Sequence, residues 1–231
     1  MRALLLAASA LVLATAPASA ASFISGPGEV TLDRTDDFTW TVNYVASTGD
    51  GLAGTTSSIL FNFLSANATG TTWNFSYLVD NTSTGPSAGS ELSSFGFNTS
   101  GAESGIATGA GNLFSGRRST GNFNGLGGRD VCLFAGPNCN GGGSNGVGSA
   151  QSPVSGTFAL NFGTGINTFV VDDFIARWQS TGANQNGSAS GAGMLMGAVP
   201  EPATWAMMLL GFGAVGYSMR RQKATQIAYA V

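Results

Sequence analysis

The chain has 231 residues, only 9% of them charged, and it contains no histidine. The missing imidazole excludes Ser-His-Asp and Cys-His catalysis as well as histidine-based zinc sites. Between the two terminal segments described below, residues 21–199 hold five arginines, no lysine and eleven acidic residues, a net charge of −6. A surface that is acidic and lacks lysine does not attract nucleic acid, so we exclude nucleic acid as a partner.

Residues 1–20 predict a cleaved secretory signal peptide. Arg2 precedes an apolar run over residues 3–16, and the small-x-small triplet Ala18-Ser19-Ala20 follows it. This order of one positive charge, a short apolar run and small residues is typical of an export signal that is cut after Ala20. We therefore expect the mature protein to begin near residue 21 and to be exported.

Alternation of apolar and polar residues predicts strands through the middle of the chain. The clearest runs are 38–45, 72–80 and 157–162, which place aromatic side chains on one face and Thr, Ser or Asn on the other. Further runs lie at 58–64, 166–171 and 173–180. Turns rich in Gly, Ser and Asn separate the runs, and we find no clear helical period longer than two turns. Residues 21–180 are therefore predicted to form an all-β domain, an antiparallel β-sandwich of jelly-roll-like type.

Two cysteines, Cys132 and Cys139, lie close together in this predicted domain. An even number of cysteines in an exported chain predicts a disulfide, and Gly136-Pro137-Asn138 between them favours a turn. A metal pair and a redox site are the alternatives. A metal would need further soft ligands, and a redox pair usually has two intervening residues rather than six. We predict a structural disulfide.

Carboxylates are the remaining candidates for chemistry. The aspartate pairs at 36–37 and 172–173 are neighbours in sequence, and neighbours in an extended chain point to opposite faces. Neither pair alone can therefore flank a sugar as the two carboxylates of a glycosidase do. A hydrolase would need Asp36, Asp130 and Asp172 to meet in one cleft. Residues 33–37 also offer oxygen ligands for calcium, without EF-hand spacing. We predict no cofactor, no metal and no catalysis.

The chain ends in a predicted linker and a predicted membrane segment. Residues 181–198 are rich in Gly, Ser and Asn, which is typical of a flexible linker. The uncharged run 203–219 would span about 26 Å as a helix, enough for a single transmembrane helix, with Trp205 near one interface. Three basic residues follow it: Arg220, Arg221 and Lys223. Because positive residues stay on the cytoplasmic side, residues 224–231 would form a short cytoplasmic tail.

In the triplet Pro200-Glu201-Pro202 two prolines flank a glutamate, and the segment is expected to be extended. It precedes Trp205-Ala206, the glycine-interrupted apolar run and the basic cluster. In this order, residues 199–223 resemble the PEP-CTERM sorting signal in its PEPxxWA form. The resemblance implies that an exosortase, a membrane enzyme, recognises the tail and processes it near Pro-Glu-Pro. It implies a precursor anchored in the inner membrane of a Gram-negative bacterium, and then a place at the cell surface or in the extracellular matrix. In the family a third basic residue usually follows the first two, whereas this chain has Gln222-Lys223 in its place.

The predicted domain is similar to the cistern family of PEP-CTERM proteins at residues 95–101, 130–143 and 174–191, a resemblance that implies no particular activity. We therefore predict an exported, non-catalytic surface or biofilm-matrix protein that an exosortase sorts. Two alternatives stay open. One is a carbohydrate-binding module for exopolysaccharide, and the other is a carboxylate-dependent hydrolase.

Overall fold

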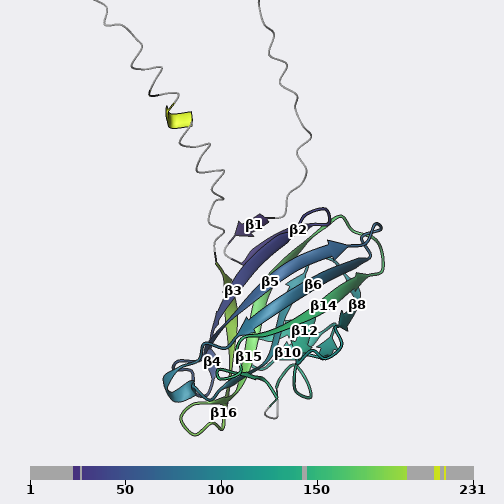
Figure 1. Cartoon of the computed structure of the whole chain (residues 1–231). Helices are drawn as coiled ribbons and strands as arrows, with labels where there is room; N and C mark the ends of the chain where they lie inside the picture. Colours follow the sequence, from purple (N-terminus) through teal and green to yellow (C-terminus); the bar gives the residue numbers. More distant parts are fainter. Residues whose placement is uncertain (1–22, 27, 142–144, 197–210, 214–215, 217–231) are drawn as a thin grey trace, which may run out of the picture.

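The computed structural model describes residues 23–26, 28–141, 145–196, 211–213 and 216 (Figure 1). As the sequence predicts, the domain is all-β, and its strands pair antiparallel. A first layer contains β3 (Phe38–Val45), β5 (Thr56–Ala66), β6 (Thr72–Asp80), β8 (Glu103–Thr108) and β14 (Val154–Phe162). A second layer contains β7 (Glu91–Thr99), β9 (Gly116–Arg118), β12 (Val131–Phe134) and β15 (Thr168–Thr181).

Short strands complete the edges of these layers. They are β1 (Phe23–Gly26), β2 (Glu29–Asp33), β4 (Thr48–Gly49) and β13 (Val147–Gly148). A separate hairpin consists of β10 (Gly121–Phe123) and β11 (Gly127–Arg129), and one 3-10 turn, η1, covers Gly85–Ser87. The last strand of the sheet, β16 (Gly187–Leu195), lies between β3 and β15 and pairs with both.

The two layers are therefore parts of one continuous sheet that folds over itself, and not the two separate sheets of a sandwich. β16 makes the junction, because Gly187–Ala192 pair with β15 whereas Gly193–Leu195 pair with β3. The crossing requires glycine: a Cβ on Gly191 would collide with the backbone oxygen of Val45. A strand that changes partners along its length can close two layers around one core.

The linker predicted over residues 181–198 is wrong for half of its length, because Gly187–Leu195 form β16. The small residues that suggested a flexible segment are those that a close crossing of strands needs. A second difference concerns residues 166–180, where one strand, β15, replaces the two that were predicted. This strand is irregular at Asp173, where φ is +54° and the ladder with β7 shifts register, and again near its end at Ser180, where φ is +56°.

Aromatic side chains fill the space between the layers. The alternation predicted in residues 38–45 and 72–80 is confirmed, since Trp40, Trp73 and Phe75 all lie in the core. Phe61 of β5 is fully buried and its ring touches rings of both layers. Its centroid lies 5.3 Å from that of Trp40 in the first layer and 6.0 Å from that of Phe97 in the second. Interlocking rings therefore hold the layers together.

Candidate functional site

Most of the predicted site residues lie outside the described residues. They are Ala18, Ala20, Pro200, Glu201, Pro202, Trp205, Arg220, Arg221 and Lys223. Within the predicted transmembrane segment, residues 211–213 and 216 are described and are helical. Among the residues that the structure describes, no helix is long and apolar enough to cross a membrane.

The predicted disulfide is confirmed: Cys132 and Cys139 are bonded, with their Cα atoms 6.2 Å apart. Cys132 belongs to β12, and Cys139 belongs to the loop that comes after it. Both pack with Phe123, Phe134 and Ile175 in a small apolar cluster that is separate from the main core. The disulfide therefore fastens a loop over the outer side of the second layer.

Replacing both cysteines with serine is expected to lower the free energy of unfolding by no more than about 2.5 kcal/mol, because the bond closes only a short loop. Denaturant unfolding of the purified domain measures the loss. Reductant should shift the midpoint of the wild type and leave that of the double-serine variant unchanged. Two free thiols in unreduced protein from an oxidising compartment would contradict the assignment.

A buried arginine lies beneath the same loop. Arg177 is 5% exposed, and burial lowers the pKa of its guanidinium from the usual value. Its Nε donates to the carbonyl oxygen of Asn140 at 2.9 Å. Nη1 and Nη2 donate to the hydroxyl oxygens of Ser190 and Ser188 at 3.0 and 2.8 Å. One cation thus ties the loop and the first part of β16 to β15 through neutral acceptors.

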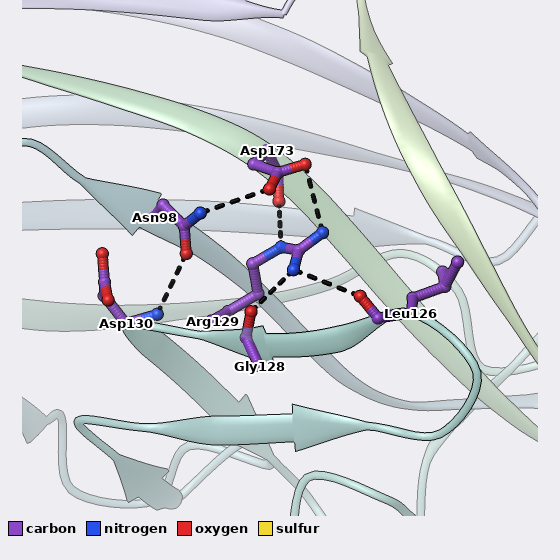
Figure 2. Close-up of polar contacts among 6 residues, drawn as sticks. All are labelled: Asn98, Leu126, Gly128, Arg129, Asp130 and Asp173. Atoms are coloured by element: carbon purple, nitrogen blue, oxygen red, sulfur yellow. Dashed lines mark hydrogen bonds and ion pairs between the residues drawn. The ribbon is translucent and has the colours of Figure 1, made fainter.

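A second arginine, Arg129, bonds to β15 at Asp173, where the strand is irregular, as Figure 2 shows. Arg129 of β11 donates from Nε to the backbone oxygen of Asp173 at 2.6 Å, and its Nη2 lies 3.1 Å from the Asp173 carboxylate. Asn98 donates to the same carboxylate at 3.2 Å and accepts from the Asp130 amide. Because the Asp173 side chain is 56% exposed, the ion pair contributes less than about 1 kcal/mol, and its role is to position the hairpin.

Carboxylates gather at this end of β15. Partial burial, followed by the negative charges of Asp173, Glu29 and Asp130, raises the pKa of Asp172, and Arg129 partly offsets the rise. Partial burial also raises the pKa of Glu103.

Asp36 does not lie beside Asp172, as the hydrolase alternative requires. In the pairing of β2 with β15, Glu29 lies opposite Asp172 and Asp33 lies opposite Thr168. Asp36 comes after Asp33, so it lies at the other end of β2 from Asp172. Oδ1 of Asp33 accepts bonds from the amide and the hydroxyl of Thr35 and closes a turn. Within the described ranges, no group of three His, Cys, Asp or Glu side chains is arranged to hold a metal ion.

The outer face of the first layer is uncharged across four strands until Asp80 at the end of β6. We call it the neutral face. Its outward residues are Thr39, Thr41, Asn43, Val45, Ser58, Leu60, Asn62, Leu64, Thr72, Asn74, Ser76, Leu78, Ser155, Thr157, Ala159 and Asn161. The hydroxyl of Thr39 donates to Asn62 at 2.9 Å, and that of Thr72 donates to Asn161 at 3.1 Å. Two shallow grooves of about 290 and 300 Å³ cross it, beside Leu60 and Leu64 respectively.

Comparison with protein families finds one match in the C-terminal segment. The family model of the PEP-CTERM protein-sorting motif matches residues 198–222. The chain carries a PEP-CTERM sorting motif. No curated protein and no solved structure matches the chain. The resemblance in the last part of the sequence is thereby confirmed, whereas nothing bears on the similarity to the cistern family.

The PEP-CTERM motif is recognised by an exosortase, so the chain is a target of that membrane enzyme. The motif also implies export of the chain and a membrane-anchored precursor that is processed to the cell surface. The part of the chain that such processing would deliver is the β domain, which ends in β16.

Proposed function

We propose that this chain is a non-catalytic surface or extracellular-matrix protein of a Gram-negative bacterium, exported by its signal peptide at residues 1–20 and processed by an exosortase. The observation that carries the proposal is the sorting motif at residues 198–222. The buried disulfide supports it, because such bonds persist in the oxidising compartments outside the cytoplasm. The β domain is then the part that reaches the cell surface, and the C-terminal tail is the sorting signal.

Intact mass of the protein released from the surface tests the proposal. We expect a chain that begins near residue 21 and lacks the segment beyond Trp205. A released chain that retains residues 206–231 would contradict exosortase processing. A protein found only in the cytoplasm would contradict export.

A second candidate function, binding of exopolysaccharide, is favoured by the neutral face. That face is uncharged in a domain of net charge −6, so it repels neither an uncharged nor an acidic polysaccharide. The acidic remainder of the surface repels an acidic polysaccharide. Side-chain amides and hydroxyls both donate and accept hydrogen bonds, as sugar hydroxyls do. Leu60 and Leu78, paired across β5 and β6 and each 38% exposed, offer apolar contact to the C–H faces of a sugar ring.

Substitution of Ser76 by aspartate, in the middle of the neutral face, is expected to weaken polysaccharide binding at least tenfold, about 1.4 kcal/mol. A bound uncharged polysaccharide would bury the new carboxylate at position 76, and a carboxylate that loses its water without a partner opposes binding. Affinity electrophoresis in gels that contain neutral exopolysaccharide from the producing bacterium measures the effect. The matched control is Ser119→Asp, at an exposed position between β9 and β10. Equal retardation of both variants would contradict the neutral face as the site.

A further inference from the structure

A small polar pocket lies on the outer side of the second layer, beside the disulfide. Its volume is about 240 Å³. One wall comes from β9 and the residues that follow it into β10, and the other comes from the loop that the disulfide fastens. The described residues that line it are Arg118, Thr120, Asn122, Asn138, Cys139 and Asn140. They supply a guanidinium, a hydroxyl and three carboxamides but no carboxylate, so this pocket of an acidic domain is rich in hydrogen-bond donors.

The register of the sheet directs Arg118 to this pocket. Arg118 lies opposite Cys132 in the antiparallel pair of β9 with β12. Residues opposite each other in such a pair place their side chains on the same face of the sheet. Cys132 points outward, because it is bonded to Cys139 and packs in the small outer cluster. The guanidinium of Arg118 therefore stands beside the disulfide, and within the described part of the chain it makes no hydrogen bond and no ion pair.

The loop wall is held in place through its backbone. The carbonyl oxygen of Asn138 accepts from an amide further along the loop at 3.1 Å. That of Cys139 accepts from the Ser94 hydroxyl at 2.7 Å, and that of Asn140 accepts from Arg177 at 2.9 Å. Three consecutive carbonyl oxygens are thus taken by protein donors, which removes the backbone acceptors that would repel an anion in the pocket.

The side chains of the two walls are also positioned before a ligand arrives. Oδ1 of Asn138 accepts from the amide of Asn140 at 2.9 Å, which leaves the Nδ2 group of Asn138 as a donor. On the other wall, Gly121 lies against the disulfide so closely that a Cβ there would collide with Cys132. Both walls are therefore fastened to the same bond, and a pocket that is ordered in advance loses little entropy on binding.

A buried cation behind the loop favours an anion in the pocket. Arg177, which bonds to Asn140, is 5% exposed and forms no ion pair within the described ranges. A charge buried without a counter-ion acts more strongly on its surroundings than a charge in water. The acid closest in sequence to β12, Asp130, lies towards β7, where its carboxylate accepts from the Thr99 amide, whereas Arg118 lies on the other side of β12.

We propose that this pocket binds one carboxylate-bearing sugar unit of an acidic polysaccharide. The guanidinium of Arg118 pairs with the carboxylate through two parallel hydrogen bonds, and the carboxamides of Asn122 and Asn138 bond to hydroxyls of the ring. The volume lies below the range of about 300–1,000 Å³ for pockets that hold drug-sized ligands, so the pocket admits a single unit. The inference rests on the second candidate function and deepens it, because it adds a site on the layer opposite the neutral face and assigns it an acidic polymer.

Calorimetric titration of the full chain, purified in a neutral detergent, with trigalacturonate tests the proposal. Arg118→Gln should weaken binding about tenfold or more, because it removes the charge that pairs with the carboxylate. Arg117→Gln is the matched control, since it changes the net charge equally. Arg117 is exposed and lies opposite Leu133, a residue of the main core, so it belongs to the other face of β9 and its variant should bind like the wild type.

Two further comparisons test the loop wall and the carboxylate. Asn138→Asp keeps an oxygen for the amide of Asn140 but replaces the donor with a negative charge, so it should also weaken binding about tenfold or more. The methyl ester of trigalacturonate keeps the hydroxyls and loses the charge, and the wild type should bind it at least about tenfold more weakly than the acid. Ser76→Asp, on the neutral face, should bind trigalacturonate like the wild type.

Absence of trigalacturonate binding by the wild type would overturn the proposal. Equal losses in Arg118→Gln and Arg117→Gln would overturn it too, because a general effect of charge would then account for both. Equal affinity for the methyl ester, or tighter binding of a sulfated trisaccharide, would overturn the assignment to a carboxylate. Failure of the neutral face to bind neutral polysaccharide is a separate result, since it concerns the other layer and contradicts only the second candidate function.

Discussion

Replacing Pro200, Glu201 and Pro202 with alanine is expected to leave the full-length precursor in the inner membrane. Each proline biases the residue before it away from the helical region, which keeps the motif extended for an enzyme to bind. Alanine favours helix and removes both that bias and the carboxylate. The apolar run of residues 203–219 is unchanged, so membrane insertion should persist while processing is lost.

Mass spectrometry of membrane and released fractions measures this result. Alanine at Thr225 and Gln226, beyond the motif match, is the matched control and should leave processing intact. Replacement of Arg220, Arg221 and Lys223 should instead disturb orientation, through loss of the positive-inside anchor. If the tail is only a membrane anchor, the alanine triple changes nothing, and peptides from beyond residue 205 appear in the released protein.

Phe61→Ala is expected to be the most destabilising single substitution in the domain. Phe61 is fully buried, and its ring contacts Trp40 in one layer and Phe97 and Phe174 in the other. Removal of a buried ring leaves a cavity and costs about 3–5 kcal/mol. For a domain of this size the melting temperature should fall by roughly 10 °C.

The adjacent residue provides the control. Leu60 precedes Phe61 in β5 but points to the outer face and is 38% exposed. Leu60→Ala should therefore cost less than about 1 kcal/mol. Thermal unfolding followed by circular dichroism compares the two. Equal losses would show that Phe61 does not join the layers as described.

Four strands of the first layer, β3, β5, β6 and β14, were predictable from sequence because each is buried on one side only, whereas β8 was not predicted. Aromatic and polar residues alternate through Phe38–Val45 and Thr72–Asp80, and the structure has these two strands with the predicted bounds. The disulfide was predictable because two cysteines in an exported chain have few other partners. The sorting motif was predictable because a membrane enzyme reads it as a linear segment, and the family model matches it directly.

Other strands carry no such alternation. β7 reads ELSSFGFNT and has six consecutive buried residues, because the sheet covers one of its faces and the loop closed by the disulfide covers the other. A strand buried on both faces shows no period of two, so no strand was predicted there. Arg177 is buried for the same reason, under a loop that comes from elsewhere in the chain.

The sequence by itself determined the half-buried strands, the disulfide and the sorting motif, because each depends on neighbouring residues alone. Only the tertiary structure decided that Gly187–Leu195 are a strand and not a linker. Glycine, serine and alanine form flexible segments in isolation, yet they are also the residues that allow β16 to cross closely past β3 and β15. Which of the two occurs depends on backbone partners more than a hundred residues away in Val42 and Tyr44, and no local pattern encodes such partners.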